Sequence, residues 1–171
     1  MPAATDSDPC PSLDTARSIH VVGVGGPGMS AIASALVGMG HVVSGSDVTE
    51  SPVLDRLRAE GVTVHVGHAE SNLGEGLDVV AISTAIPRDN LEVLAAQRRG
   101  IPVVRRDVLL PAMAAGRRTI AVTGTHGKTT TASMLALILI EAGLDPAFLV
   151  GGDVAQLGTN ARSVSYTHLT L

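Results

Sequence analysis

Aromatic residues and cysteine are nearly absent from this sequence of 171 residues, which has one Phe, one Tyr, no Trp and one Cys. A single cysteine excludes an internal disulfide and any cysteine-based metal cluster. Apolar residues still make up 45% of the chain, so a core can form, and it must be aliphatic. The length allows one large domain or two small ones.

Positive charge is also scarce, and the formal net charge is -4. Nucleic-acid binding needs clustered basic residues, so this balance argues against a nucleic-acid partner. No window is apolar for long enough to span a membrane, and the opening segment lacks the basic start and apolar run of a signal peptide. We therefore expect a cytoplasmic protein without membrane insertion, in which residues 1–17 form a disordered tail.

The chain contains one lysine, Lys128, which lies in the sequence GTHGKTTT. We expect a buried strand before it at 118–123 and a helix after it at 129–142, with an apolar face formed by Met134, Leu135, Ile138 and Leu139. Strand, glycine-rich turn and helix is the order of a phosphate-binding loop, where backbone N–H groups and the helix dipole attract an anion. The compact ammonium of lysine suits the same task.

This loop predicts an ATP site. Lys128 would reach the β and γ phosphates, and the Thr129 hydroxyl would be a Mg²⁺ ligand. His126 is a second catalytic candidate, through contact with the ATP phosphates or the reacting carboxylate, although it could also serve loop geometry alone. The usual pattern G-x-x-x-x-G-K-[ST] would need a glycine at Val122, so a simple glycine-threonine turn is the alternative. The candidate ATP ligands are Gly124, Thr125, His126, Gly127, Lys128, Thr129 and Thr130.

A second glycine loop, GVGGPG at 23–28, fits the pattern G-x-G-x-x-G. It lies between an expected strand at 18–22 and an expected helix at 29–39. Asp47 follows the next expected strand, about twenty residues after the third glycine, where a dinucleotide-binding fold holds a ribose. NAD would fit this pattern, and so would any other ligand with a diphosphate and a ribose, such as a UDP-sugar.

The two loops together resemble the Mur ligases of peptidoglycan synthesis over roughly residues 18–162. Within this family, the branch that adds L-alanine to UDP-N-acetylmuramate is more similar than the branch that recycles murein tripeptide, which shares GTHGKTTT but differs at the first loop. The resemblance rests on IHVVGVGGPGMS at 19–30, VSGSD at 43–47, Gly67 with His68, Ser83 to Ile86 with Asn90, Ile101 to Val103 with Arg106, GTHGKTTT at 124–131, and Gly151-Gly152 with Asn160-Ala161.

The expected fold class is α/β, because the chain repeats strand and helix with short connections. We expect a Rossmann-like parallel-sheet domain at 18–115 that binds the UDP-sugar, and the start of a P-loop ATP-binding domain at 116–162. Ligands of such sheets bind at the carboxyl ends of the strands, where the candidate residues fall. The candidate UDP-sugar ligands are Gly25, Gly26, Pro27, Gly28, Met29, Ser30, Ser46, Asp47, His68, Ser83, Thr84, Ala85 and Ile86.

The resemblance implies an ATP-dependent ligase that uses Mg²⁺. Such an enzyme phosphorylates the lactyl carboxylate of UDP-N-acetylmuramate, and the amine of L-alanine then attacks the acyl phosphate. The final residues 163–171 do not continue the family pattern, so we expect a truncated chain with a foreign tail and no turnover. Two other classes stay open: an NAD-dependent oxidoreductase, and a nucleotide-binding module without catalysis.

Overall fold

A computed structural model describes residues 9–10, 12–154, 156, 158–162 and 168–170. Strands and helices alternate along most of the described chain, which confirms the α/β class. One helix begins at Pro52, directly after Ser51, because proline fits the first helical turn. The first unit consists of β1 (Ser18–Val22), α1 (Pro27–Gly38), β2 (Val42–Asp47), α2 (Pro52–Ala59), β3 (Thr63–Val66), the short 3-10 helix η1 (Glu70–Asn72), β4 (Val79–Ile82), α3 (Leu91–Arg98), β5 (Val103–Arg105) and α4 (Arg106–Ala114).

The five strands of this unit form one parallel sheet in the order β3-β2-β1-β4-β5. The chain builds outward from β1 to β3 and then crosses back to β4, on the other side of β1. The sheet therefore has a switch point between β1 and β4, and open parallel sheets bind ligands at such a point.

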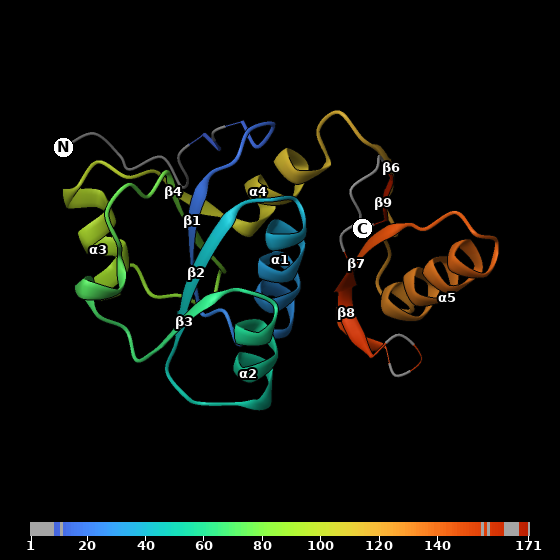
Figure 1. The fold of residues 1–171 in the computed structure, drawn as a ribbon, viewed down its shortest axis with the longest axis horizontal. Helices are drawn as coiled ribbons and strands as arrows, with labels where there is room; N and C mark the ends of the chain where they lie inside the picture. The colour runs from blue at the N-terminus through green and yellow to red at the C-terminus, as the bar shows by residue number, and fades with distance from the viewer. Residues whose placement is uncertain (1–8, 11, 155, 157, 163–167, 171) are drawn as a thin grey trace.

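Helices cover both faces of the sheet, with α1 and α2 on one side and α3 on the other (Figure 1). The larger core includes Ile32 and Leu36 of α1, Leu57 of α2 and Leu109 of α4. The smaller core joins Val93 of α3 to Val80 of β4. Both cores are aliphatic, as the composition requires.

A second sheet has the strand order β6-β9-β7-β8. Its elements are β6 (Arg118–Ile120), β7 (Ala147–Val154), β8 (Thr159–Arg162) and β9 (His168–Thr170), and the helix α5 (Lys128–Glu141) packs on β7. Residues 163–167 and 171 of the expected foreign tail lie outside the described residues, whereas 168–170 pair in parallel with β6 and β7.

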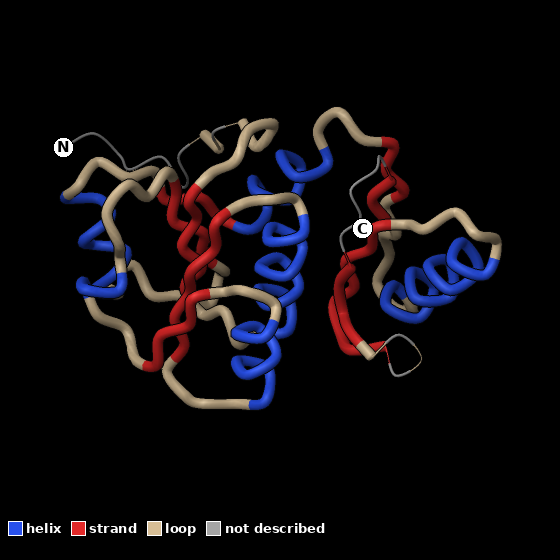
Figure 2. Tube along the Cα trace, in the orientation of Figure 1, coloured by secondary structure: helices blue, strands red, loops and turns tan. Residues whose placement is uncertain are grey.

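Helix α1 lies between the two sheets, and β7 and β8 lie between α1 and α5 (Figure 2). A helix that is apolar on all sides is expected to be buried. Ala31, Ile32, Ala33 and Leu36 of α1 are fully buried. Burying a side chain such as Leu36 contributes about 1.5–3 kcal/mol. Because α1 begins at the glycine loop, the same helix connects the second sheet to that loop.

Two predictions about the second unit were wrong. The expected buried strand at 118–123 is the three-residue strand β6, and its residues are exposed. Its partner among the described residues is β9, and α5 packs on β7 instead. The buried face of α5 is also rotated from the expected one. Ala132 and Ala136 pack against Phe148 and Val150, while Met134 and Ile138 are exposed. Small side chains let the helix approach β7 closely, which apolar periodicity alone does not reveal.

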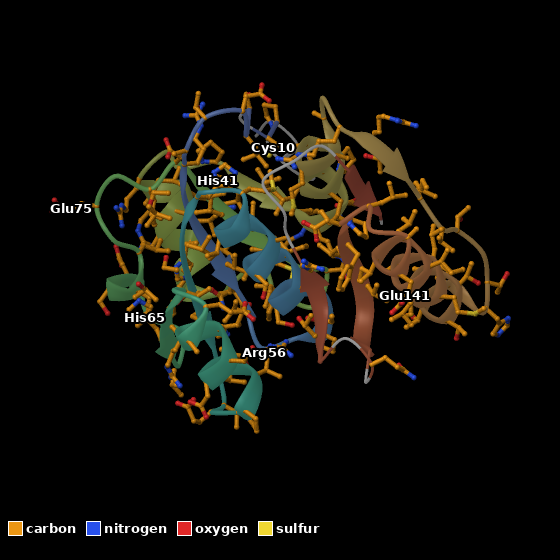
Figure 3. All side chains as sticks on the ribbon, turned by 45° about the vertical axis from the view of Figure 1, so that its right-hand side comes forward. Cys10, His41, Arg56, His65, Glu75 and Glu141 are labelled. Carbon is orange, nitrogen blue, oxygen red and sulfur yellow. The ribbon has the colours of Figure 1, made fainter. Side chains whose placement is uncertain are left out.

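Part of the segment expected to be a disordered tail packs against the first unit. Leu13 is buried in the larger core, and Cys10 packs against that core. The Arg17 amide donates a hydrogen bond to His41 Nδ1 at 3.1 Å. Figure 3 shows Cys10 and His41 at the same end of the molecule, away from His65 in β3. Residues 1–8 and 11 lie outside the described residues.

Candidate functional site

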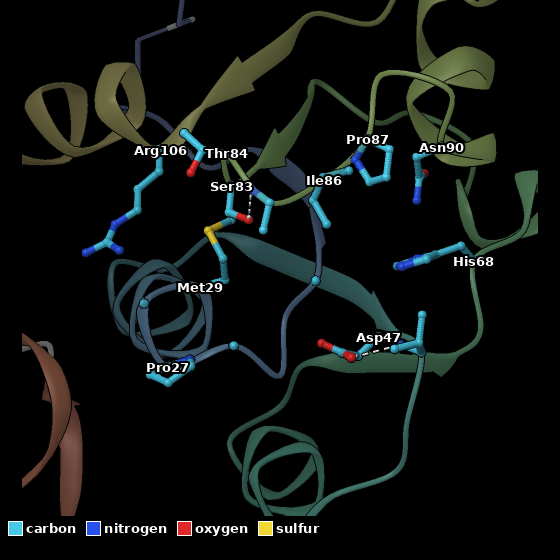
Figure 4. Close-up of a pocket in the computed structure, with 15 residues that line it drawn as sticks. Pro27, Met29, Asp47, His68, Ser83, Thr84, Ile86, Pro87, Asn90 and Arg106 are labelled. Atoms are coloured by element: carbon cyan, nitrogen blue, oxygen red, sulfur yellow. Dashed lines mark hydrogen bonds between the residues drawn. The ribbon is translucent and has the colours of Figure 1, made fainter.

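A pocket of about 620 Å³ lies at the carboxyl ends of the five strands of the first sheet. Its volume falls in the range of small-molecule sites. Residues at or just after the end of each strand line the pocket, and Figure 4 shows the labelled side chains among them. The pocket is lined by Gly23, Gly26, Pro27, Gly28 and Met29 after β1, Asp47 and Val48 around the end of β2, His68 after β3, Ser83, Thr84, Ala85, Ile86, Pro87 and Asn90 after β4, and Arg106 after β5.

The structure brings most of the predicted UDP-sugar residues together in this pocket. Gly25, Ser30 and Ser46 do not line it. Ser30 is buried in α1, where its hydroxyl donates to the Pro27 carbonyl at 3.1 Å. Ser46 is buried under the pocket and takes part in a polar network described below. Of these three residues, Ser46 contacts a residue that lines the pocket, His68, through its side chain.

The glycine loop is held in place from β2. The Gly23 and Val24 amides donate to the Ser46 carbonyl at 2.8 and 3.0 Å. The Gly25 amide donates to Asp47 Oδ2 at 2.8 Å, and the Val48 amide donates to Asp47 Oδ1 at the same distance. A carboxylate has lone pairs beyond these two bonds. Asp47 can therefore hold the loop and still accept a hydrogen bond from a ligand hydroxyl.

Arg106 is a pocket residue that sequence reasoning did not assign to the site. Its guanidinium lies directly over Gly28 at the start of α1, and a methyl group on Gly28 would come within 2.2 Å of Arg106 Nη1. Arg106 makes no hydrogen bond or ion pair within the described part of the chain. An uncommitted guanidinium beside a helix N-terminus provides two kinds of donor to an anion, and a phosphate suits both.

A buried carboxylate, Glu92 of α3, lies beneath the pocket and was also not foreseen. Ser46 Oγ donates to Glu92 Oε2 at 2.6 Å, and His68 Nδ1 lies 3.1 Å from the same oxygen. Asn72 Nδ2 donates to Glu92 Oε1 at 2.7 Å. Burial disfavours the charged carboxylate, but interactions with His20, Ser46 and Asn72 outweigh it and lower the Glu92 pKa to about 2. Glu92 is therefore an anion at neutral pH.

The predicted ATP loop lies in the second unit and is exposed. Gly127 has φ of 78°, the left-handed region that favours glycine, and α5 begins at Lys128. Lys128 Nζ donates to the Gly124 carbonyl at 2.5 Å and to the Thr125 carbonyl at 3.2 Å. The ammonium thus lies against the backbone of its own loop, beside the first turn of α5, whose amides lack intrahelical acceptors. This arrangement of donors fits a phosphate.

Thr129 has no cluster of metal-ligating side chains around it among the residues that the structure describes. Within the described ranges, no group of three or more His, Cys, Asp and Glu side chains is placed to hold a metal ion. The described chain therefore fits Mg²⁺ only as an ion held largely by nucleotide phosphates and water, with the Thr129 hydroxyl as one ligand. None of the described helices has the length and apolar character that a membrane crossing requires.

Comparison with known proteins gives one consistent family. Residues 18–118 match the family described as "Mur ligase family, catalytic domain". The chain is 53% identical over 146 residues to UDP-N-acetylmuramate–L-alanine ligase of Acidovorax sp. (strain JS42), and 47% identical over 146 residues to that of Carboxydothermus hydrogenoformans. These matches cover 85% of this chain but only 30% and 32% of the relatives, so the chain spans about a third of their length.

Solved structures agree with this result. The UDP-N-acetylmuramate-alanine ligase of Thermotoga maritima superposes with a TM-score of 0.81 at 31% identity, covering 91% of this chain and 37% of that one. The UDP-N-acetylmuramate:L-alanyl-gamma-D-glutamyl-meso-diaminopimelate ligase from Neisseria meningitides gives 0.80 at 33% identity, covering 91% and 52%. The predicted resemblance is confirmed, and the chain belongs to the Mur ligase family.

Proposed function

We infer that this chain carries the UDP-sugar site and the ATP loop of an ATP-dependent ligase that joins L-alanine to UDP-N-acetylmuramate. One observation carries the UDP-sugar assignment: the Arg106 guanidinium, which has no partner among the described residues, lies over Gly28 at the N-terminus of α1, inside a pocket of about 620 Å³. A diphosphate there would receive charge-assisted hydrogen bonds from Arg106 and bonds from backbone amides. Asp47, one strand away, would accept a hydrogen bond from the ribose.

In the proposed reaction, the γ-phosphoryl group of ATP passes to the lactyl carboxylate, and the L-alanine amine displaces phosphate from the acyl phosphate. Phosphoryl transfer depends on positioning and on neutralising charge, so a nucleophilic side chain is not required. Lys128 would leave the Gly124 carbonyl and hold the β and γ phosphates, and ATP would bring Mg²⁺ to the Thr129 hydroxyl. His126 is placed in the same loop. We propose the cytoplasm as the location.

A dissection of the nucleotide tests the UDP-sugar site. Isothermal calorimetry would compare UDP-N-acetylmuramate, UDP and uridine on the wild-type chain. We expect UDP to retain most of the affinity of the full ligand, and uridine to bind at least about a hundredfold more weakly, since the charged bonds to the diphosphate are lost. Equal affinity for uridine and UDP would place the diphosphate outside the Arg106 pocket.

The ATP loop needs a separate experiment. ATP binding would be measured with and without Mg²⁺ on the wild type and on Lys128→Ala, with Arg118→Ala as a control in the neighbouring exposed strand β6. We expect Lys128→Ala to weaken ATP binding by tenfold or more, since a charged hydrogen bond to phosphate is lost. Arg118→Ala should change it little. Unchanged ATP binding in Lys128→Ala would contradict the proposal that this loop binds the ATP phosphates.

A further inference from the structure

The polar network under the pocket determines which nitrogen of His68 carries the ring proton. His68 Nδ1 lies 3.1 Å from Glu92 Oε2 and 2.9 Å from Ser46 Oγ. The Glu92 carboxylate can only accept hydrogen bonds while it is ionised. Ser46 has one hydroxyl proton, and it is used in the hydrogen bond of 2.6 Å that Ser46 Oγ donates to Glu92 Oε2. Ser46 Oγ can therefore only accept from the ring.

Two acceptors thus face Nδ1. An unprotonated Nδ1 would place its lone pair against a carboxylate and against a hydroxyl oxygen whose proton points elsewhere. A protonated Nδ1 donates to both. In a neutral imidazole the other nitrogen, Nε2, is then an acceptor. Nε2 of His68 has no hydrogen-bond partner among the described residues. Because it is also not one of the buried atoms that lack a partner, it must be accessible to solvent.

The ring of His68 points into the pocket in Figure 4, and its side chain is 18% exposed. Glu92 is in turn held rigidly. It is completely buried at the start of α3, its Oε1 accepts from Asn72, and the Asn90 side chain caps the amides of Glu92 and Val93. The helix N-terminus also favours a negative charge at this position.

We propose that Glu92 is a positioning residue that fixes His68 as the Nδ1–H tautomer, so that Nε2 accepts a hydrogen bond from an O–H or N–H group of the nucleoside. This proposal rests on the proposed UDP-sugar site. His68 lies at the end of β3, next to the β2 end that carries Asp47. The donor is a ribose hydroxyl or the uracil N–H, and the phosphates, which have only acceptor oxygens, belong to Arg106.

The tautomer is tested without any ligand. A long-range ¹H–¹⁵N spectrum of the wild-type histidine rings, recorded where the ring is neutral, should show His68 with a protonated Nδ1 and an unprotonated Nε2. Ser46→Ala should keep this tautomer, because the carboxylate remains. Glu92→Gln should change it or mix the two forms, and Glu70→Gln, an exposed acid of η1, is the matched control. A wild-type ring protonated on Nε2 would overturn the proposal.

Binding then tests what Nε2 contacts. UDP, 2′-deoxy-UDP, 3′-deoxy-UDP and N3-methyl-UDP would be titrated into the wild type and into His68→Ala. We expect one modified nucleotide to bind about tenfold more weakly than UDP to the wild type, and this difference to disappear in His68→Ala. The same losses in both proteins would overturn the nucleoside contact. If UDP does not bind the wild type at all, the proposed function fails, whereas the tautomer is judged by its own spectrum.

Discussion

Gly25 and Asp47 form a direct link between the glycine loop and the second strand. The Gly25 amide donates to Asp47 Oδ2 at 2.8 Å, and a methyl group on Gly25 would lie 2.8 Å from the same oxygen. A glycine is therefore needed at position 25 so that the loop can approach the Asp47 carboxylate closely. The same carboxylate also accepts from the Val48 amide, so Asp47 determines the shape of the loop at the floor of the pocket.

Replacing Asp47 should damage both binding and the loop. Asp47→Ala leaves the Gly25 and Val48 amides without their acceptor, at a cost of about 1–3 kcal/mol in the free energy of unfolding. Urea denaturation would measure this cost, and calorimetry would show weaker UDP-N-acetylmuramate binding. Asp55→Ala, an exposed acid on α2, is the matched control. A stable Asp47→Ala protein with full affinity would show that the loop keeps its shape without the carboxylate.

Gly28 and Arg106 should behave as one unit. Because a Cβ at position 28 would occupy the place of Arg106 Nη1, Gly28→Ala is expected to displace the guanidinium and to weaken UDP-N-acetylmuramate binding by about tenfold or more. Arg106→Ala should cause a similar loss. The double variant should then be little worse than either single variant, since both remove the same interaction. Fully additive losses in calorimetry would mean that the two residues act separately.

How much of this site the sequence predicts depends on whether a residue's role is local. The loop at 23–28 and Asp47 were predicted because glycine spacing and strand ends are local patterns. Arg106 was one of the residues behind the family resemblance. Its role follows only from the sheet order, because β5 and β1 lie in one parallel sheet and their carboxyl ends face the same pocket. An arginine at the end of a strand of the parallel sheet is the signal that could have identified it, and Arg105 and Arg106 stand together at the end of β5.

Glu92 gave no usable signal, since an acid in the first turn of a helix is ordinary capping chemistry. Glu92 is buried because η1 and the end of β2 pack against α3 in the tertiary structure, and the local sequence does not reveal this contact. The exposed strand β6 was missed for a related reason. Apolar residues such as Ile120 indicate burial only if another element covers them, and coverage is a property of the tertiary structure.

Acid should destabilise the protein through Glu92. Its folded-state pKa of about 2 lies below the ordinary value of 4.5, so its stabilisation is fully present above pH 4.5 and is lost as the pH falls toward 2. The shift corresponds to a contribution on the order of 3 kcal/mol. Urea denaturation between pH 5 and pH 2 should therefore show a steeper loss for the wild type than for Glu92→Gln. Parallel pH profiles would contradict this role of Glu92.

Asn160 should couple the second sheet to the glycine loop. Its Nδ2 donates to the Pro27 carbonyl at 2.8 Å, its Oδ1 accepts from Arg56, and the side chain is buried. Asn160→Ala removes both hydrogen bonds, while the Pro27 carbonyl still accepts from the Ser30 hydroxyl and Arg56 still pairs with Glu60, so the expected cost is about 0.5–1.5 kcal/mol for each bond lost. Hydrogen exchange should show faster exchange at the start of α1, with Gln97→Ala on the exposed face of α3 as control. Unchanged exchange in α1 would mean that the sheets pack without this contact.

The most direct test of the central claim is a pair of calorimetric titrations of the wild-type chain, one with UDP-N-acetylmuramate and one with NADH. Both ligands carry a diphosphate and a ribose, so the comparison separates the Mur ligase assignment from a nicotinamide site in the same fold. Our account predicts that UDP-N-acetylmuramate binds at least about tenfold more tightly, and that Arg106→Ala removes most of this affinity while Arg105→Ala does not. Tighter binding of NADH would contradict it.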